Sequence, residues 1–456
     1  MAVIRSISGL RATLGDGLTP ELISNYSASF AKYLPEGKII IGRDGRPSGQ
    51  WIENIVLGTL QACGREIISL GIVPTPTVQL FVEKSEAVGG IIITASHNPE
   101  QWNGLKFLNS DGVFLDGSDN QNLWKIYDSK DFSFKEYFQF PDIEFNNNAI
   151  NSHINSILNL KLFRYSEVLN KLKERKFKIV VDAVNSSGSV AILSLLATLG
   201  CEVIPLYCDG TGFFPHTPEP LPENLSDLSN SVIRNNADLG IAVDPDADRL
   251  VLIDELGKPI GEEKTITLAA QCVFENLEYF EFKNGKPKIV VNHSTTRMVD
   301  DVAAKFGGIV IRSAVGEINV VKKMKEFDAV IGGEGSGGVI LPESHYGRDS
   351  LVGTSLILSL LALKNQTLSH ISEQLQSYEM LKFKKEFKGG LEQVIEKIIF
   401  EFPEAEIIKE DGVKINLNDS WVQLRASNTE PIVRVISEAV DEKKAKELAS
   451  RVLNLL

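Results

Sequence analysis

The sequence predicts an α/β protein with three similar mixed α/β domains followed by a smaller C-terminal α+β domain. Short β-branched runs, typical of buried strands, alternate with longer amphipathic stretches, which favours mostly parallel sheets. The runs also come in three successive pairs, each run followed by a polar loop, which indicates an internal repeat. The paired runs are residues 38–44 with 89–95, 177–183 with 239–245, and 288–294 with 328–334.

Local signals predict the helices and the last domain. The amphipathic stretches 51–64 and 186–200 end at glycine, which predicts helices with glycine C-caps. The C-terminal segment places the strand-like runs VKINL, WVQLRAS and PIVRVIS between two helical stretches, and Asp441 is a predicted N-cap of the closing helix. We therefore expect a polar connection over 128–160 and four domains. Their expected bounds are 1–150, 151–254, 255–366 and 367–456.

The composition predicts a cytoplasmic protein that acts on small molecules. The mean hydropathy of the 456 residues is −0.02. No apolar run approaches the ~20 residues of a membrane span, and the N-terminus lacks the apolar stretch of a signal peptide. The formal charge of −13 argues against non-specific nucleic-acid binding. The four cysteines show no CxxC spacing, so we expect reduced thiols rather than zinc. We expect a monomer or homodimer without a membrane or nucleic-acid partner.

DPDADR, residues 244–249, is a dense acidic motif after a strand-like run. The carboxylates of Asp244, Asp246 and Asp248 repel one another at this spacing unless a cation holds them, and hard divalent cations prefer such oxygen ligands. The alternative is three solvated aspartates at a turn. An EF-hand is excluded because Arg249 stands where that loop needs glycine and because both flanking runs are strand-like. The motif therefore predicts a divalent-cation site.

TASHNP, residues 94–99, ends another strand-like run. Pro99 keeps the residue before it out of helical geometry, so Ser96 and His97 are expected in a loop at a strand end. Ser96 is a candidate nucleophile. The GxSxG motif of α/β-hydrolases is absent here, and a histidine adjacent in sequence is no evidence for a catalytic triad.

GGEGSGG, residues 332–338, matches a dinucleotide-binding pattern only formally, because a strand-like run and not a helix follows it. Its glycines favour a loop that lets a ligand approach the backbone. Glu334 and Ser336 are candidates to hydrogen-bond a polyol in that loop. The alternative is a glycine-rich hairpin.

RASNTEP, residues 425–431, carries a guanidinium and several small donors in the last domain. Such a set suits a phosphate dianion, although an Asn-containing hairpin turn is the alternative. The candidate phosphate-binding residues are Arg425, Ser427, Asn428, Thr429 and, just downstream, Arg434.

These four loops together resemble those of the α-D-phosphohexomutase superfamily, which includes phosphoglucomutase, phosphomannomutase and phosphoglucosamine mutase. TASHNP resembles the phosphoserine loop, DPDADR the metal loop, GEGSGG the sugar loop and RASNTEP the phosphate loop, and the resemblance covers the whole chain in the family's order. It implies three similar α/β domains and a C-terminal domain around a central cleft, in agreement with the repeat.

The resemblance also implies a chemistry. A reversible 1,6 phosphoryl transfer on hexose phosphates would pass through a phosphoserine and a bisphosphate, with a hexose 1,6-bisphosphate as activator. Mg²⁺ would be held by the three aspartates and a phosphoserine oxygen, and would neutralise charge during transfer. The residues implied at the chemistry are Ser96, His97, Lys106 and Arg11, with Arg43 in a less direct role. Those implied at the substrate are Arg249, Glu334, Ser336, Arg425, Ser427, Asn428, Thr429 and Arg434.

Five positions depart from the family pattern. Ala12 stands where glycine is common, and Ala426 and Asn428 replace the proline and glycine of RPSGTEP. Glu317 and Gly338 stand where relatives carry histidine, which weakens any transfer of sugar specificity. The predicted reaction is the interconversion of glucosamine 6-phosphate and glucosamine 1-phosphate. Phosphomannomutase or phosphoglucomutase activity is the alternative. Less favoured are a metal-dependent sugar phosphatase and a non-catalytic Ca²⁺-binding protein.

Overall fold

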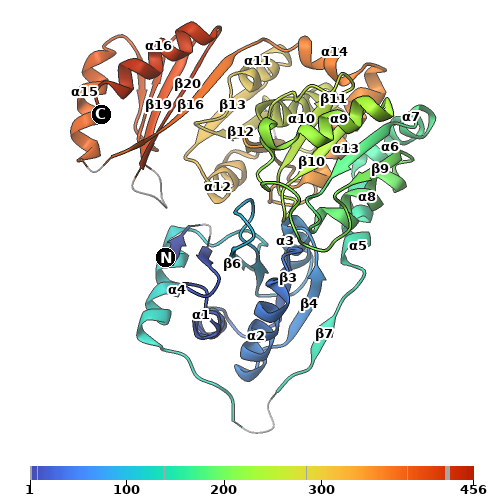
Figure 1. Cartoon of the computed structure of the whole chain (residues 1–456), viewed down its shortest axis with the longest axis vertical. Helices are drawn as coiled ribbons and strands as arrows, with labels where there is room; N and C mark the ends of the chain where they lie inside the picture. Colours follow the sequence, from blue (N-terminus) through green and yellow to red (C-terminus); the bar gives the residue numbers. More distant parts are fainter. Residues whose placement is uncertain (1–2, 8, 137–139, 284, 388, 427–431) are drawn as a thin grey trace.

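The computed structural model describes residues 3–7, 9–136, 140–283, 285–387, 389–426 and 432–456. These residues form four sheets, each with helices packed on it, and we call the corresponding parts of the chain domains I to IV (Figure 1). In the view of Figure 1, domain IV lies at the upper left, domains III and II continue the upper part of the molecule to the right, and domain I lies below them.

Domain I contains the largest sheet of the described chain, with the strand order β1-β2-β6-β5-β3-β4-β7. β5 has the sequence GGIII and is buried along its whole length, as expected for a strand covered on both faces. The elements of domain I are β1 (Ile4–Ser6), β2 (Gly9–Thr13), α1 (Pro20–Tyr33), β3 (Ile39–Arg43), α2 (Gly49–Ala62), β4 (Ile67–Ile72), α3 (Thr75–Glu83), β5 (Gly89–Ile93), β6 (Trp102–Asn109), α4 (Gly117–Ser129) and β7 (Ile143–Phe145).

Domains II and III share one continuous hydrophobic core around α13. The elements of domain II are α5 (Ala149–Leu158), α6 (Lys161–Tyr165), α7 (Val168–Arg175), β8 (Lys178–Asp182), α8 (Gly188–Thr198), β9 (Glu202–Leu206), α9 (Ser226–Asn235), β10 (Leu239–Val243) and β11 (Leu250–Asp254). Those of domain III are α10 (Glu263–Glu275), β12 (Lys288–Asn292), α11 (Met298–Lys305), β13 (Ile309–Ser313), α12 (Glu317–Phe327), β14 (Ile331–Glu334), β15 (Gly338–Ile340), α13 (Ser350–Lys364) and α14 (Leu368–Glu373).

The sheets of domains I to III repeat one topology. The orders β6-β5-β3-β4, β11-β10-β8-β9 and β15-β14-β12-β13 are equivalent. In each, three parallel strands lie in the order third, first, second, and an antiparallel strand pairs with the third. The predicted threefold repeat is therefore confirmed, and the six runs chosen from the sequence are the first and third strands of the three units.

Domain IV is the predicted smaller α+β domain, with an antiparallel sheet in the order β16-β20-β19-β18-β17 and its own core. Asp441 caps α16 as expected, because its carboxylate accepts a hydrogen bond from the Lys444 backbone N–H. The elements are β16 (Glu379–Glu386), α15 (Leu391–Glu401), β17 (Glu406–Ile408), β18 (Val413–Asn416), β19 (Trp421–Ala426), β20 (Ile432–Ala439) and α16 (Glu442–Leu453).

The segment 128–160, expected to be a polar connection, also contributes ordered structure. β7 extends the sheet of domain I, and α5 buries His153 completely. The His153 Nδ1 lies 3.0 Å from Thr77 Oγ1 of α3, and its Nε2 lies 2.8 Å from Asp349 Oδ2 at the start of α13. His345 Nε2 lies 3.0 Å from the same oxygen. This buried network joins domain I, α5 and domain III behind the site described below.

Asp349 carries much of that network, because its other carboxylate oxygen caps α13 by accepting from the backbone N–H groups of Leu351 and Val352. Replacing Asp349 with Asn turns an amide toward two imidazole N–H groups and leaves buried donors without acceptors. We expect D349N to lower the free energy of unfolding by about 2–4 kcal/mol. Denaturant unfolding, with amide exchange localised to α5 and α13, checks this. The exposed N-cap variant Thr367→Ala is the control and should lose only about 1 kcal/mol.

Candidate active site

The loop after β5 holds Ser96 in an unusual backbone conformation. Ser96 has φ of +51°, the left-handed region that residues other than glycine rarely adopt, and it is 2% exposed. Its backbone N–H donates to Thr94 Oγ1 at 2.8 Å, and the Thr94 hydroxyl in turn donates to Asp44 Oδ2. These bonds hold the serine in a costly geometry, which is common at functional sites.

Arg46 is the residue that organises this loop, and the sequence analysis missed it. Its guanidinium is 1% exposed, pairs with Asp44 Oδ2 at 3.0 Å, and donates to the carbonyl oxygens of Ser96 and Asn98, each at 2.6 Å. A further bond reaches the Pro99 carbonyl. Arg43, in contrast, pairs with Glu53 at 2.7 Å and supports the fold of domain I. A buried arginine bonded to several loop carbonyls fixes their positions.

The three aspartates of DPDADR lie together at the end of β10, and each is 0% exposed. The Ser96 hydroxyl donates to Asp244 Oδ2 at 3.0 Å, which brings the candidate nucleophile of domain I to the acidic loop of domain II. The prediction that this loop is not an EF-hand is confirmed, because strand β11 follows it directly. The interpretation as solvated aspartates is wrong, since all three carboxylates are buried.

Two cationic side chains bind the Oδ2 atoms of Asp246 and Asp248. Lys106, on β6, donates to Asp246 Oδ2 at 2.7 Å and lies 3.5 Å from Asp248 Oδ2. Arg348 pairs with the same oxygen of Asp248 at 2.6 Å. The remaining oxygens, Asp246 Oδ1 and Asp248 Oδ1, have no hydrogen-bond partner among the described residues. Lys106 is thus a buried residue of the site.

The cluster fits a divalent cation. It offers only hard oxygen donors that lie within 4.8 Å of one another, and two of them are orphaned acceptors. Burial, and then the charges of Asp248 and Asp246, raise the pKa of Asp244 well above its ordinary value, although Arg249 and Lys106 oppose the shift. The site therefore remains short of positive charge, and a cation bound to the free oxygens would supply it.

His97, Arg11 and Arg249 lie beside the loop of Ser96. The His97 Nδ1 lies 3.2 Å from Ser96 Oγ, and its Nε2 lies 3.9 Å from Glu219 Oε1. Burial, with the charges of Arg249 and Arg11, holds the pKa of His97 well below its usual range, so the ring is neutral. Arg11 donates to Asn98 Oδ1 at 3.0 Å, and Arg249 lies 3.9 Å from Glu219.

The sugar loop turns between β14 and β15 beside the acidic cluster. Glu334 accepts from Asn292 Nδ2 at 2.9 Å and from the Gly316 backbone N–H, while Arg348 donates to its other oxygen at 2.7 Å. Burial would raise the pKa of Glu334, but Arg348 and Asn292 together hold it below its ordinary value. Ser336 is half-buried in the turn. A strand follows the loop, which confirms the rejection of a dinucleotide site.

The phosphate candidates of domain IV form a pair of arginines. Arg425 on β19 lies directly opposite Arg434 on β20, so both side chains project from the same face. Both Nε atoms are buried without a hydrogen-bond partner in the described chain, and burial followed by the Arg434 charge lowers the pKa of Arg425. Asp411 opposes this shift with its Oδ2 3.6 Å from Arg425 Nη1, so that one carboxylate faces a pair of like-charged guanidinium groups. Ser427, Asn428 and Thr429 lie outside the described residues.

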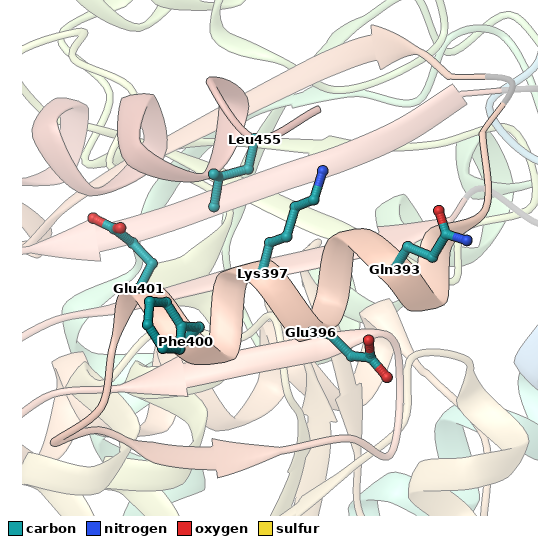
Figure 2. A pocket seen from close by; sticks show the side chains of 6 residues that line it. All are labelled: Gln393, Glu396, Lys397, Phe400, Glu401 and Leu455. Carbon is teal, nitrogen blue, oxygen red and sulfur yellow. The ribbon is translucent and has the colours of Figure 1, made fainter.

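Two other features are not part of this site. In the cluster of His153, His345 and Asp349, the imidazole Nε2 atoms already meet the aspartate oxygen, which accounts for their positions by hydrogen bonding. A surface hollow of about 560 Å³ lies on α15 of domain IV, where Lys397, Phe400 and Leu455 are among its lining residues (Figure 2). α15 stands at the far edge of domain IV, away from the acidic loop (Figure 1).

Comparisons with known proteins identify the family. Sequence models of the three α/β domains and the C-terminal domain of phosphoglucomutase/phosphomannomutase match residues 4–134, 151–257, 262–378 and 381–455. A phosphoglucomutase/phosphomannomutase of Thermococcus kodakarensis is 34% identical, over 98% of this chain and 97% of its own length. A probable phosphoglucosamine mutase of Methanopyrus kandleri is 33% identical, over 98% and 96%.

A solved phosphoglucomutase/phosphomannomutase family protein from Burkholderia thailandensis superposes with a TM-score of 0.85 and 25% identity, covering 99% of this chain and 96% of that one. The chain therefore belongs to the phosphoglucomutase/phosphomannomutase family of the α-D-phosphohexomutase superfamily. It is a phosphohexomutase, an isomerase that acts by intramolecular phosphoryl transfer. None of the helices described is both long and apolar enough to cross a bilayer.

The role of Arg46 is testable because lysine keeps the charge but carries all its donors on one nitrogen, so it cannot reproduce the planar fork whose separate nitrogens reach Asp44 and the loop carbonyls. We expect R46K to leave the protein folded and to lower kcat/KM by about 10–100-fold, since small displacements of a reacting group cost about that much. Steady-state kinetics and thermal unfolding separate the two effects. The control is Arg43→Lys, which should lower stability but leave kcat/KM within about twofold.

The acidic loop should bind a divalent cation directly. Replacing Asp246 with Asn removes a charge and one hard oxygen ligand, so the dissociation constant for Mn²⁺ should rise by at least about tenfold. Isothermal titration calorimetry on the metal-free protein measures this without turnover. Asp111→Asn changes an exposed carboxylate that pairs with Lys325 and should leave Mn²⁺ binding unchanged. Equal affinities in the two variants would remove the loop as the cation site.

Proposed function

We propose that this phosphohexomutase interconverts glucosamine 6-phosphate and glucosamine 1-phosphate through a phosphorylated Ser96 and a hexose 1,6-bisphosphate. The observation that carries the chemistry is the bond from the Ser96 hydroxyl to Asp244 at 3.0 Å, at the edge of a buried acidic cluster with free carboxylate oxygens. The names of several relatives as phosphoglucosamine mutases support the sugar.

The side chains around Ser96 suit phosphoryl transfer. Mg²⁺, held by Asp244, Asp246, Asp248 and an oxygen of the phosphorylated serine, would neutralise charge on the transferring group. Lys106 and Arg348 bind the Oδ2 atoms of Asp246 and Asp248. These bonds fix the orientation of both carboxylates and therefore the positions of their Oδ1 atoms, which have no hydrogen-bond partner among the described residues.

Proton transfer in both directions needs an acceptor near each oxygen. When the phosphoryl group returns to Ser96, the hydroxyl proton can pass to the neutral His97, whose Nδ1 lies 3.2 Å away. For the sugar hydroxyl we assign Lys106, which must first give up its own proton and leave its bond to Asp246, because only the neutral amine can accept the hydroxyl proton.

The substrate would be held at its two ends. Glu334 and Ser336 would bind two sugar hydroxyls, and Arg249 and Arg11 lie near enough to the serine loop to contact the phosphate being transferred. Arg425 and Arg434, with Ser427, Asn428 and Thr429, would grip the phosphate that does not react, in both orientations of the bisphosphate. A hexose 1,6-bisphosphate would phosphorylate resting enzyme and act as activator.

Other members of the substrate class remain the alternative, because pockets discriminate poorly between sugars that differ at one position. The Thermococcus relative is named for glucose and mannose phosphates, which favours testing those sugars. A metal-dependent sugar phosphatase would use the same loops but release inorganic phosphate.

Intact-mass measurement and a sugar panel test the proposal. After incubation with glucose 1,6-bisphosphate and Mg²⁺, the wild type should gain one phosphate, whereas Ser96→Ala should gain none and lose all turnover. Ser85→Ala, on the surface at the end of α3, is the matched control and should behave as wild type. Unprimed protein should show a lag that the bisphosphate abolishes.

kcat/KM for the 1-phosphates of glucosamine, glucose and mannose then ranks the substrates, and glucosamine should be first. A ranking led by glucose or mannose would replace the sugar but keep the mechanism. Release of inorganic phosphate without isomerisation would replace the mutase with a phosphatase. A protein that is inactive on all three sugars after priming would end the proposal.

A further inference from the structure

Arg348 lies just before α13 and its side chain is 12% exposed. Each of its donor groups meets a different carboxylate. Nη2 contacts Asp248 Oδ2 of the metal loop at 2.6 Å, Nη1 contacts Glu334 Oε2 of the sugar loop at 2.7 Å, and Nε contacts Glu317 Oε2 at 3.0 Å. One guanidinium therefore connects the cation-binding loop of domain II to the sugar loop of domain III.

Gly338 makes room for this arginine. A Cβ at position 338 would lie 2.3 Å from Arg348 Cδ, 3.0 Å from Cγ and 3.5 Å from Nε, and these are the three nearest atoms. A distance of 2.3 Å between non-bonded carbons is not tolerated, so any side chain at 338 and Arg348 in this position exclude one another. Arg348 can therefore adopt this position only because residue 338 has no side chain.

Glu317 is the second residue that keeps Arg348 in this position, because its carboxylate accepts a hydrogen bond from Arg348 Nε. It is 6% exposed, and its other carboxylate oxygen accepts from Gln79 Nε2 at 2.9 Å. Burial raises the pKa of Glu317 to about 7, and Arg348 opposes that shift. Gln79 lies on α3, so the chain of contacts continues into domain I, which also contributes Ser96. The Glu317 carboxylate is therefore held on both sides, by Arg348 and by Gln79.

From these contacts we propose that Arg348 is the residue that positions the sugar loop against the metal loop in this enzyme, and that Glu317 and Gly338 are adapted to it. Arg348 is a positioning residue, because it acts through Glu334 and Asp248. Its loss would let Glu334 turn and would misplace the sugar relative to Ser96.

The inference rests on the proposed function of the two loops, and a double-mutant cycle tests it. Gly338→Ala adds one methyl group that must displace Arg348, whereas Arg348→Ala removes the arginine and leaves space for that methyl group. We expect each change alone to raise the dissociation constant for glucosamine 6-phosphate by about 10–100-fold. The double variant should be no more than about twofold worse than Arg348→Ala.

The dissociation constants are measured by calorimetry with EDTA present, so that binding is read without turnover. With Mg²⁺ added, KM should rise and kcat fall together in Gly338→Ala, and thermal unfolding of each variant shows that the proteins compared are folded at the assay temperature. Arg348→Lys should bind with intermediate affinity, because it keeps the charge but not the three separate donors. It also replaces Arg348→Ala if that variant fails to fold.

Two control variants are matched to these changes. Gly58→Ala adds a methyl group where nothing lies within 4 Å. Arg65→Ala removes an arginine that donates to backbone carbonyls in domain I, including that of Leu34 at 2.7 Å. Both should leave sugar-phosphate binding unchanged.

Additive effects in the cycle, or a dissociation constant within about twofold of wild type in Gly338→Ala, would overturn the role of Arg348. If the wild type itself bound no hexose phosphate, the proposed function would fail first. That result is distinguishable from a failure of the cycle, because it requires no variant.

Discussion

The burial of three carboxylates in one loop is the constraint on which the site depends. At an effective dielectric constant of about 20, two unit charges 4 Å apart interact by about 4 kcal/mol, so Asp244, Asp246 and Asp248 cannot all be ionised without nearby cations. The chain supplies three: Lys106 from domain I, Arg348 from domain III, and Arg249 beside the loop itself, whose Nε lies 4.0 Å from Asp248 Oδ1. Removing the charge partner of a buried ion costs several kcal/mol. The acidic loop therefore favours an arrangement in which the three domains meet.

The repeated topology explains why these residues meet. Ser96 follows β5, the acidic loop follows β10, and Glu334 ends β14, and these are the third strands of three equivalent sheets. The carboxyl ends of parallel strands are where α/β proteins place ligands. One structural position, used three times, thus supplies Ser96, the acidic cluster and Glu334, to which we assign the phosphoryl carrier, the cation site and the sugar contact. What differs between the copies is the side chain at the strand end.

The sequence predicted the strands that lead to the site and the loops that follow them. It did not predict the other strands of each sheet or the arginines that hold the loops. GGIII and DPDADR are local patterns, so β5, β10 and the acidic loop could be placed directly. The second strands of domains II and III, β9 and β13, were not predicted. Both lie at the edges of their sheets, and most of their residues are partly exposed. Arg46 and Arg348 were missed for another reason. Their partners lie up to 100 positions away along the chain, and only the folded contacts distinguish them from solvated arginines.

Three consecutive residues show how closely the subsites are joined. The Val315 N–H donates to Asp411, whose carboxylate lies 3.6 Å from Arg425 in the phosphate pair of domain IV. The Gly316 N–H donates to Glu334, and the Glu317 carboxylate meets Arg348. One short segment therefore contacts the phosphate domain, the sugar loop and the arginine bound to the metal loop. A displacement of domain IV that moves Asp411 would act on Val315, and the next residue along the chain, Gly316, donates to Glu334. The positions of the two ends of a bound sugar phosphate would thus not be independent.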